Sequence, residues 1–106
     1  MGTLLDLKRD EPIHLKRGDI LLGILKPYEY DFPWINCRFE AAAAFDEIKA
    51  LFEDELTVMR SRDINAWEES YDKIKSLDLR LVSPDGKNEL DEFLLHVRND
   101  EAWFRA

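Results

Sequence analysis

The chain has very little cysteine: Cys37 is the only one in 106 residues. A single cysteine cannot close an internal disulfide, so nothing here requires an oxidising compartment. Long apolar runs are also missing, since the longest covers only residues 20–25, whereas a membrane-spanning helix needs about 20 apolar residues. The first residues show no signal-peptide pattern, because charged side chains interrupt the leucines. We therefore expect a cytoplasmic protein that does not bind a membrane.

Positive charge is scarce as well. The sequence has 15 lysines and arginines against 23 aspartates and glutamates, which gives a net charge of −8. Its basic clusters are no longer than pairs such as Lys16-Arg17, whereas a nucleic-acid-binding protein needs a basic surface. We expect no nucleic-acid partner. An acidic surface favours encounters with basic proteins, although solubility alone also accounts for such a charge.

Catalytic and metal-binding motifs are absent. There is no phosphate-binding loop, no G-x-S-x-G and no dinucleotide fingerprint, and the histidines and cysteine lack zinc-ligand spacing. The acids around Asp85-Gly86 do not follow the calcium-loop pattern. Arg17-Gly18-Asp19 is typical of a hairpin turn. We expect no metal and no cofactor, and the sequence favours a protein that is not an enzyme.

One nucleophile still has to be weighed. A thiol such as Cys37 becomes reactive next to a base, so either His14 or His96 could form a dyad with it. No spacing in the sequence brings these residues together. A buried, unreactive cysteine is the favoured interpretation.

The two ends of the chain show strand patterns. Residues 20–25 are apolar on both faces, which indicates a central strand, and Pro27 should end that strand because it cannot donate to the ladder. Arg17-Gly18 and Ser83-Pro84-Asp85-Gly86 have the composition of turns. The expected strands cover residues 3–8, 13–16, 19–25, 34–39, 79–82, 90–97 and 102–104.

The middle of the chain changes to helical spacing. Apolar residues recur every three or four positions in two segments, and Asp63 between them can cap the second helix. A short polar connection makes the two helices antiparallel neighbours. The apolar stripe of the first helix is Phe45, Ile48, Phe52, Leu56 and Met59, and that of the second is Ile64, Trp67, Tyr71 and Ile74.

Strands, then two helices, then strands predict an α+β fold. We expect one domain spanning residues 1–106, with an antiparallel sheet of about four to six strands and both helices packed on one of its faces.

The segment EYDFPWINCRFE, residues 29–40, is the leading candidate site. In one interpretation its aromatic residues Phe32, Trp34 and Phe39 fill the edge of the core. In the other, Tyr28, Tyr30 and Trp34 stay partly exposed beside acids such as Asp31, and this surface binds a partner. The sequence leaves both interpretations open. The candidate interaction residues are Tyr28, immediately before this segment, and Tyr30, Asp31 and Trp34 within it.

A second candidate is the acidic run Glu53, Asp54 and Glu55. These carboxylates crowd the C-terminal half of the first helix, where the helix dipole prefers cations. Either the run is a solvated helix face, or it attracts an electropositive partner.

Two functions are compatible with these observations. The first is a small, acidic, non-enzymatic interaction protein that binds a protein partner, basic in the sharpest version, or a second copy of itself. An inhibitor of a basic protein, of the immunity or antitoxin type, is one form of it. The alternative is a small-molecule-binding protein or enzyme, with a pocket between sheet and helices and with His14, Cys37 or His96 at its mouth.

Overall fold

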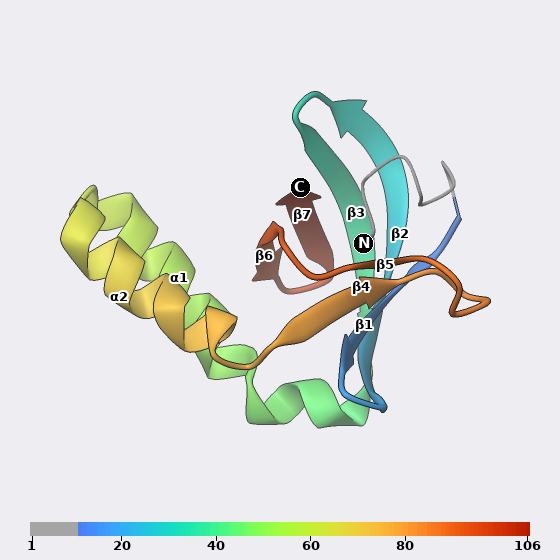
Figure 1. The fold of residues 1–106 in the computed structure, drawn as a ribbon. Coiled ribbons are helices and arrows are strands. Elements are labelled where there is room, and N and C mark those ends of the chain that lie inside the picture. Colours follow the sequence, from blue (N-terminus) through green and yellow to red (C-terminus); the bar gives the residue numbers. More distant parts are fainter. Residues whose placement is uncertain (1–10) are drawn as a thin grey trace.

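The chain folds into a curled antiparallel sheet with two α-helices inserted between its third and fourth strands (Figure 1). This computed structural model describes residues 11–106, so the strand expected at residues 3–8 lies outside the described part. The strands are β1 (Ile13–Arg17), β2 (Ile20–Asp31), β3 (Trp34–Ala41), β4 (Leu79–Val82), β5 (Glu89–Leu90), β6 (Leu94–Arg98) and β7 (Glu101–Arg105). The helices are the 3₁₀-helix η2 (Ala43–Glu47) and the α-helices α1 (Lys49–Ser61) and α2 (Ile64–Lys75).

The strand order in the sheet is β5-β4-β1-β2-β3-β7-β6, and every pairing is antiparallel. The predicted α+β class is confirmed, but the sheet has seven strands rather than about four to six. One reason is that the strand expected at residues 90–97 is interrupted after Leu90, and the chain resumes pairing only at Leu94.

Tight turns join the strands where the sequence supplies residues that tolerate positive φ. Gly18 has φ 61° in the turn between β1 and β2, and Asn99 has φ 56° in the turn between β6 and β7. Phe32 and Pro33, joined by a cis peptide bond, form the turn between β2 and β3. The prediction that Pro27 ends its strand is wrong. It lies at an irregularity in the β2–β3 register, where a missing N–H donor is tolerated, and β2 continues to Asp31.

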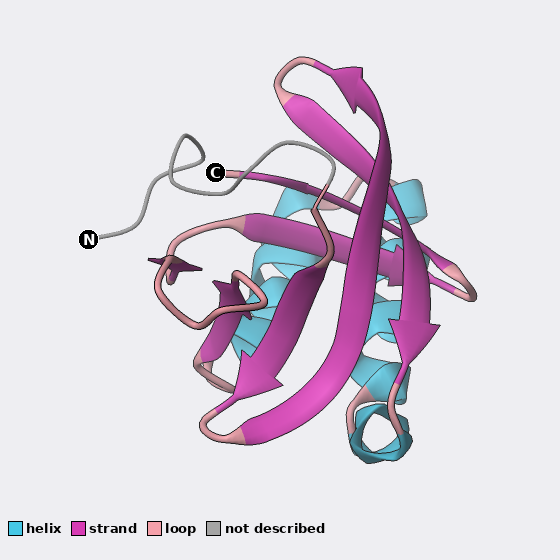
Figure 2. Ribbon diagram, turned by 90° about the vertical axis from the view of Figure 1, so that its right-hand side faces the viewer, coloured by secondary structure: helices cyan, strands magenta, loops and turns pink. Residues whose placement is uncertain are grey.

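The core lies between the inner face of the sheet and the helical segment. Inward-facing side chains of all seven strands pack with one side of η2, α1 and α2, in a single cluster that includes Leu15, Phe39, Phe52, Leu81 and Phe104. Both α-helices lie on the same side of the sheet, next to β6 (Figures 1 and 2).

Most of the predicted helical stripe is buried, with two corrections at the helix connection. Met59 is exposed, and Ile64 is 68% exposed. The connection between α1 and α2 lies at the end of the helix pair farthest from the sheet, so these side chains have no sheet to pack against (Figure 1). The side chain of Asp63 caps α2, as expected, by accepting a hydrogen bond from the backbone N–H of Ala66 at 3.1 Å. None of the helices in residues 11–106 is both long and apolar enough to cross a membrane.

Candidate functional site

All three tryptophans of the chain converge on one buried pair of polar residues, Glu55 and His96. Glu55 belongs to α1 and is 0% exposed, and His96 belongs to β6 and is 4% exposed. Nδ1 of His96 lies 2.7 Å from Oε1 of Glu55. Nε1–H of Trp67 in α2 donates a hydrogen bond of 2.7 Å to the other carboxylate oxygen. Three separate elements are therefore joined through one carboxylate.

Such a network holds its members in one arrangement, because a buried polar group that loses its partner is costly. Each oxygen of the Glu55 carboxylate has a partner, and no buried side-chain polar atom in residues 11–106 lacks one. The pair consequently fixes how the two helices dock beside β6.

Tyr71 adds a second connection between α2 and β6. Its hydroxyl accepts a hydrogen bond from the backbone N–H of Leu95 at 2.8 Å and donates one to the carbonyl of Phe93 at 3.4 Å. β6 is an edge strand of the sheet, so it has no neighbouring strand on one side. The Tyr71 hydroxyl accepts the hydrogen bond of the Leu95 amide in place of such a strand. Burial raises the pKa of Tyr71, the hydrogen bond from Leu95 lowers it, and the charge of Glu55 raises it; the net shift is upward.

His96 links this buried network to the outer face of the sheet. In the register of the sheet, Asn36, Trp103 and His96 stand opposite one another on β3, β7 and β6, so their side chains share a face. The His96 ring centroid lies 5.4 Å from that of Trp103 and 5.5 Å from that of Trp34. Both indoles are half-buried, so each has one side on His96 and part of its surface in solvent.

The outward side chains of β3 pair with neighbouring strands in a regular way. The guanidinium of Arg105 lies 5.5 Å from the ring centroid of Trp34, and that of Arg38 lies 5.3 Å from the ring of Tyr28. Between them, Asn36 donates a 2.7 Å hydrogen bond from Nδ2 to Oε1 of Glu29.

An exposed aromatic residue extends this surface. Phe32 is 93% exposed at the tip of the β2–β3 hairpin, immediately before Pro33 and Trp34. We call this surface the aromatic face, and it consists of Tyr28, Phe32, Trp34, Arg38, Trp103 and Arg105.

The structure divides the segment 29–40 between the two interpretations. Phe39 is buried in the core, Tyr30 is half-buried against it, and Trp34 is half-buried on the aromatic face. Phe32, which the core interpretation placed inside, is almost fully exposed because it occupies a two-residue turn that projects beyond the sheet. Tyr28 and Asp31 are exposed, as the interaction interpretation expects.

The acidic run also divides. Glu53 and Asp54 are exposed on α1, but Glu55 is fully buried and is not part of an acidic surface. Its position explains this, since it follows the buried Phe52 by three residues and shares its side of the helix. The signal available in the sequence was the position of Glu55, which lies next to Leu56 and three residues after Phe52 and so falls within the apolar stripe of the helix.

Sequence reasoning missed the parts of the site that come from the end of the chain. Trp103 and Arg105 alternate with the buried Ala102 and Phe104 of β7 and were not among the candidate residues. His96 was a candidate, but as a partner of Cys37 or of a ligand rather than of Glu55. The alternation of strand β6 places His96 on the face opposite to Leu95 and Val97, but no sequence spacing indicates its contact with α1.

The dyad considered for Cys37 does not form. Cys37 points into the core opposite Ala102. The His96 ring is buried against Glu55, Trp34 and Trp103 on the opposite face of the sheet, and His14 is half-buried and alternates with the core residues Ile13 and Leu15. Burial raises the pKa of the Cys37 thiol to about 12, which keeps it protonated. None of these three residues lines the groove beside α1 or the groove beside the end of α2.

Two of the acids near Asp85-Gly86, Glu89 and Asp91, form ion pairs with Arg80, as does Asp78. The guanidinium of Arg80 lies 3.0 Å from Glu89, 3.3 Å from Asp78 and 3.4 Å from Asp91. Within residues 11–106, no group of three or more histidine, cysteine or acidic side chains is arranged to hold a metal ion.

Comparisons with known proteins found no relative of this chain. No family model matches the chain, and no curated protein and no solved structure matches it either. A function for this chain can therefore be proposed only from the geometry of the aromatic face and of the Glu55–His96 pair.

Proposed function

We propose that this chain is a cytoplasmic, non-enzymatic interaction module whose aromatic face binds a protein partner of net positive charge. One observation carries the proposal: Trp34 and Trp103 are partly exposed and rest on a histidine that a buried carboxylate holds in place.

The composition of the aromatic face matches that of binding hot spots. Tryptophan, tyrosine and arginine are the residues that contribute most to protein interfaces, and they do so from well-packed positions. Side chains that are fixed before binding lose less conformational entropy when the complex forms. The contacts of His96 with Trp34 and Trp103 supply that prior order, and Phe32 adds an apolar side chain with almost no internal contact.

Charge favours a basic partner over a second copy of the chain. Two molecules that each carry a net charge of −8 repel one another as they approach. The carboxylates of Asp31 and Glu101 stand near the aromatic face and have no ion-pair partner within residues 11–106. A basic protein would be attracted both by the net negative charge of the chain and by these two carboxylates. An inhibitor of a basic protein, of the immunity or antitoxin type, is the sharpest form of this function.

Capture from a lysate of the source organism tests the proposal if matched variants are compared. Phe32→Ala removes an exposed ring of the aromatic face, and Ile64→Ala removes an exposed apolar side chain at the start of α2. We expect a basic protein that wild type and Ile64→Ala retain, that Phe32→Ala loses, and that all three lose at high salt. A partner retained equally by Phe32→Ala would contradict the proposal, and so would recovery of the chain alone in a self-associated form.

A further inference from the structure

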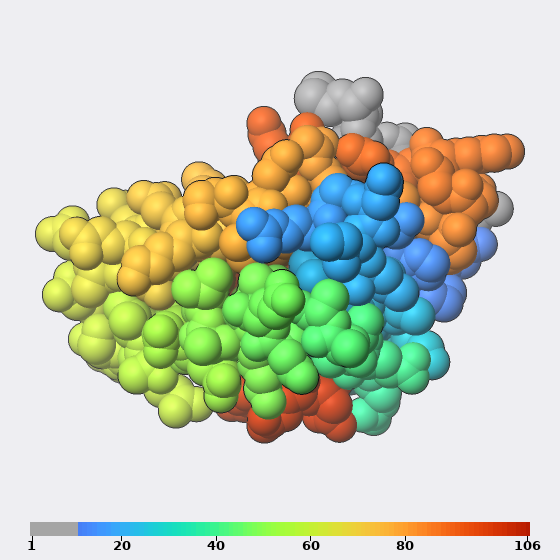
Figure 3. Space-filling model, turned by 90° about the horizontal axis from the view of Figure 1, so that it is seen from below, coloured from blue at the N-terminus to red at the C-terminus, as the bar shows by residue number. Residues whose placement is uncertain are grey.

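A groove runs between α1 and the turn that joins β6 to β7. In the view of Figure 3, the first part of the helical segment, in green, lies against the C-terminal strands, in red. Phe45, Phe52, Leu56 and Val97 are buried and form the apolar floor of the groove. Its volume is about 190 Å³. None of the residues of the aromatic face lines it.

The rim of the groove is positively charged in a protein that is otherwise acidic. Lys49, Arg60 and Arg98 stand around the opening with one acid, Glu53. None of the three cations has an ion-pair partner within residues 11–106, although the chain as a whole has an excess of carboxylates. Cations left unpaired around an apolar floor are the arrangement expected of an anion-binding pocket.

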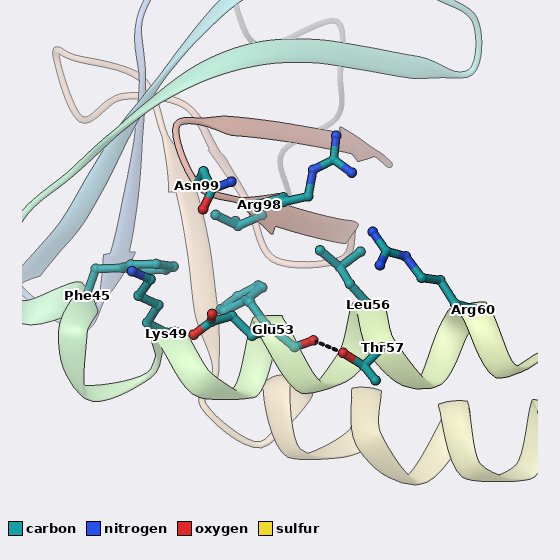
Figure 4. A pocket seen from close by; sticks show the side chains of 10 residues that line it. Phe45, Lys49, Glu53, Leu56, Thr57, Arg60, Arg98 and Asn99 are labelled. Atoms are coloured by element: carbon teal, nitrogen blue, oxygen red, sulfur yellow. Dashed lines mark hydrogen bonds between the residues drawn. The ribbon is translucent and has the colours of Figure 1, made fainter.

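The charges are also unevenly distributed along the groove. In Figure 4, Arg60 and Arg98 extend toward the end at which Leu56 lies, and Lys49 is at the opposite end beside Phe45. The Glu53 carboxylate points toward the Lys49 end, so it does not offset the arginines. The arginine end therefore presents two guanidinium groups, which bind carboxylates through paired hydrogen bonds.

The size of the groove limits what can occupy it. A buried apolar cavity of about 150 Å³ accepts one benzene molecule, and this groove, at about 190 Å³, is only slightly larger. It accommodates one ring or a short branched chain, with room for one polar substituent.

We propose that the groove binds a small amphipathic carboxylate. Its ring or branched chain lies on Phe52, Leu56 and Val97, and its carboxylate accepts hydrogen bonds from Arg60 and Arg98. This site is independent of the proposed partner surface, so either assignment stands or falls without the other.

Benzoate is a suitable probe, with benzyl alcohol as a neutral compound of similar shape. Each is titrated into the ¹⁵N-labelled full chain while backbone amide shifts are recorded. Benzoate should shift amides in residues 45–60 and 97–99 with a millimolar dissociation constant, and benzyl alcohol should bind about tenfold more weakly.

Two variants test the role of the arginines. The double change Arg60→Gln with Arg98→Gln alters only exposed side chains without an ion pair in residues 11–106, so the protein should keep its fold. It should weaken benzoate binding about tenfold. Arg17→Gln, in the turn between β1 and β2, removes an equal charge outside the groove and should change the affinity by less than about twofold.

Three results would overturn the proposal. They are the absence of shifts at tens of millimolar benzoate, equal binding of benzyl alcohol and benzoate, and unchanged benzoate affinity in the double arginine variant.

Discussion

The imidazole Nδ1 of His96, on the edge strand β6, lies 2.7 Å from a carboxylate oxygen of Glu55, which is 41 residues earlier in the chain, in α1. This contact joins the helix pair to β6, and the His96 ring on that strand packs against Trp34 of β3 and Trp103 of β7. The positions of Trp34 and Trp103 on the aromatic face therefore depend on a pair that is buried inside the chain.

Breaking the Glu55–His96 pair should destabilise the protein strongly. Glu55→Ala leaves His96 and the indole N–H of Trp67 without their acceptor, and His96→Ala leaves a buried carboxylate with one partner. Each change should lower the free energy of unfolding by about 2–5 kcal/mol. Measured by urea denaturation, the double variant should cost clearly less than the two single losses added together, because the residues interact directly. Strict additivity would show that the pair is not coupled.

Local patterns account for the elements of the fold, but not for this pair. Alternation and turn residues predict β1, β4 and the Gly18 turn, and helical spacing predicts the buried stripe from Phe45 to Leu56. Glu55 was placed with its exposed neighbours Glu53 and Asp54, because a run of acids normally marks a solvated surface. Its burial depends on a histidine that only the folded chain brings close, and such long-range pairing leaves no periodic signal in one sequence.

The exposure of Phe32 and Ile64 escaped prediction for a similar reason. Both are large apolar residues, and the sequence pattern around each of them led to the expectation that they pack in the core. An apolar side chain is buried only if another element of the fold covers it. Phe32 lies in the turn between β2 and β3, and Ile64 lies at the start of α2, where the helix pair is farthest from the sheet (Figure 1). Sequence periodicity assigns such apolar residues to the core. In the folded chain they are exposed and can contact a partner.

Gly23 should not tolerate a side chain. A Cβ atom at this position would lie 2.5 Å from two ring atoms of Phe39 and 3.0 Å from the carbonyl oxygen of Glu40. The backbone of Gly23 is outside the positive-φ region, so the cost of Gly23→Ala comes from the clash rather than from the main chain. We expect a loss of about 1–3 kcal/mol in the free energy of unfolding. Phe39→Leu should cost less in the Gly23→Ala background than in wild type; an equal cost in both would exclude the clash as the cause.

Tyr71 should protect the free edge of β6. Tyr71→Phe removes the hydroxyl that accepts the hydrogen bond from the Leu95 amide, which leaves a buried N–H without a partner. The expected loss in stability is about 1–3 kcal/mol, and the Leu95 amide should exchange with deuterium faster than in wild type. Tyr28→Phe serves as the control, because Tyr28 is exposed and its hydroxyl makes no hydrogen bond within residues 11–106. Unchanged protection of Leu95 in Tyr71→Phe would contradict this account.

Cys37 should make the protein sensitive to alkaline pH. Burial raises the pKa of the thiol from 9.0 to about 12 in the folded state. The folded chain therefore holds this proton more tightly than the unfolded chain, and stability falls as the pH rises above the unfolded pKa. Between about pH 8 and about pH 10, wild type should lose about 1.4 kcal/mol more than Cys37→Ala. Parallel pH dependence of the two proteins, measured by chemical denaturation, would show that the thiol does not carry this effect.

The affinity of the recovered partner for three forms of the chain, measured by titration calorimetry, tests whether the aromatic face is the binding surface. Phe32 is 93% exposed and Ile64 is 68% exposed, so truncating either side chain should leave the fold unchanged. If the aromatic face is the binding surface, Phe32→Ala should weaken binding by at least about tenfold, and Ile64→Ala should bind within about twofold of wild type. Equal affinity of all three forms would show that the partner binds elsewhere and that the aromatic face is not the functional site.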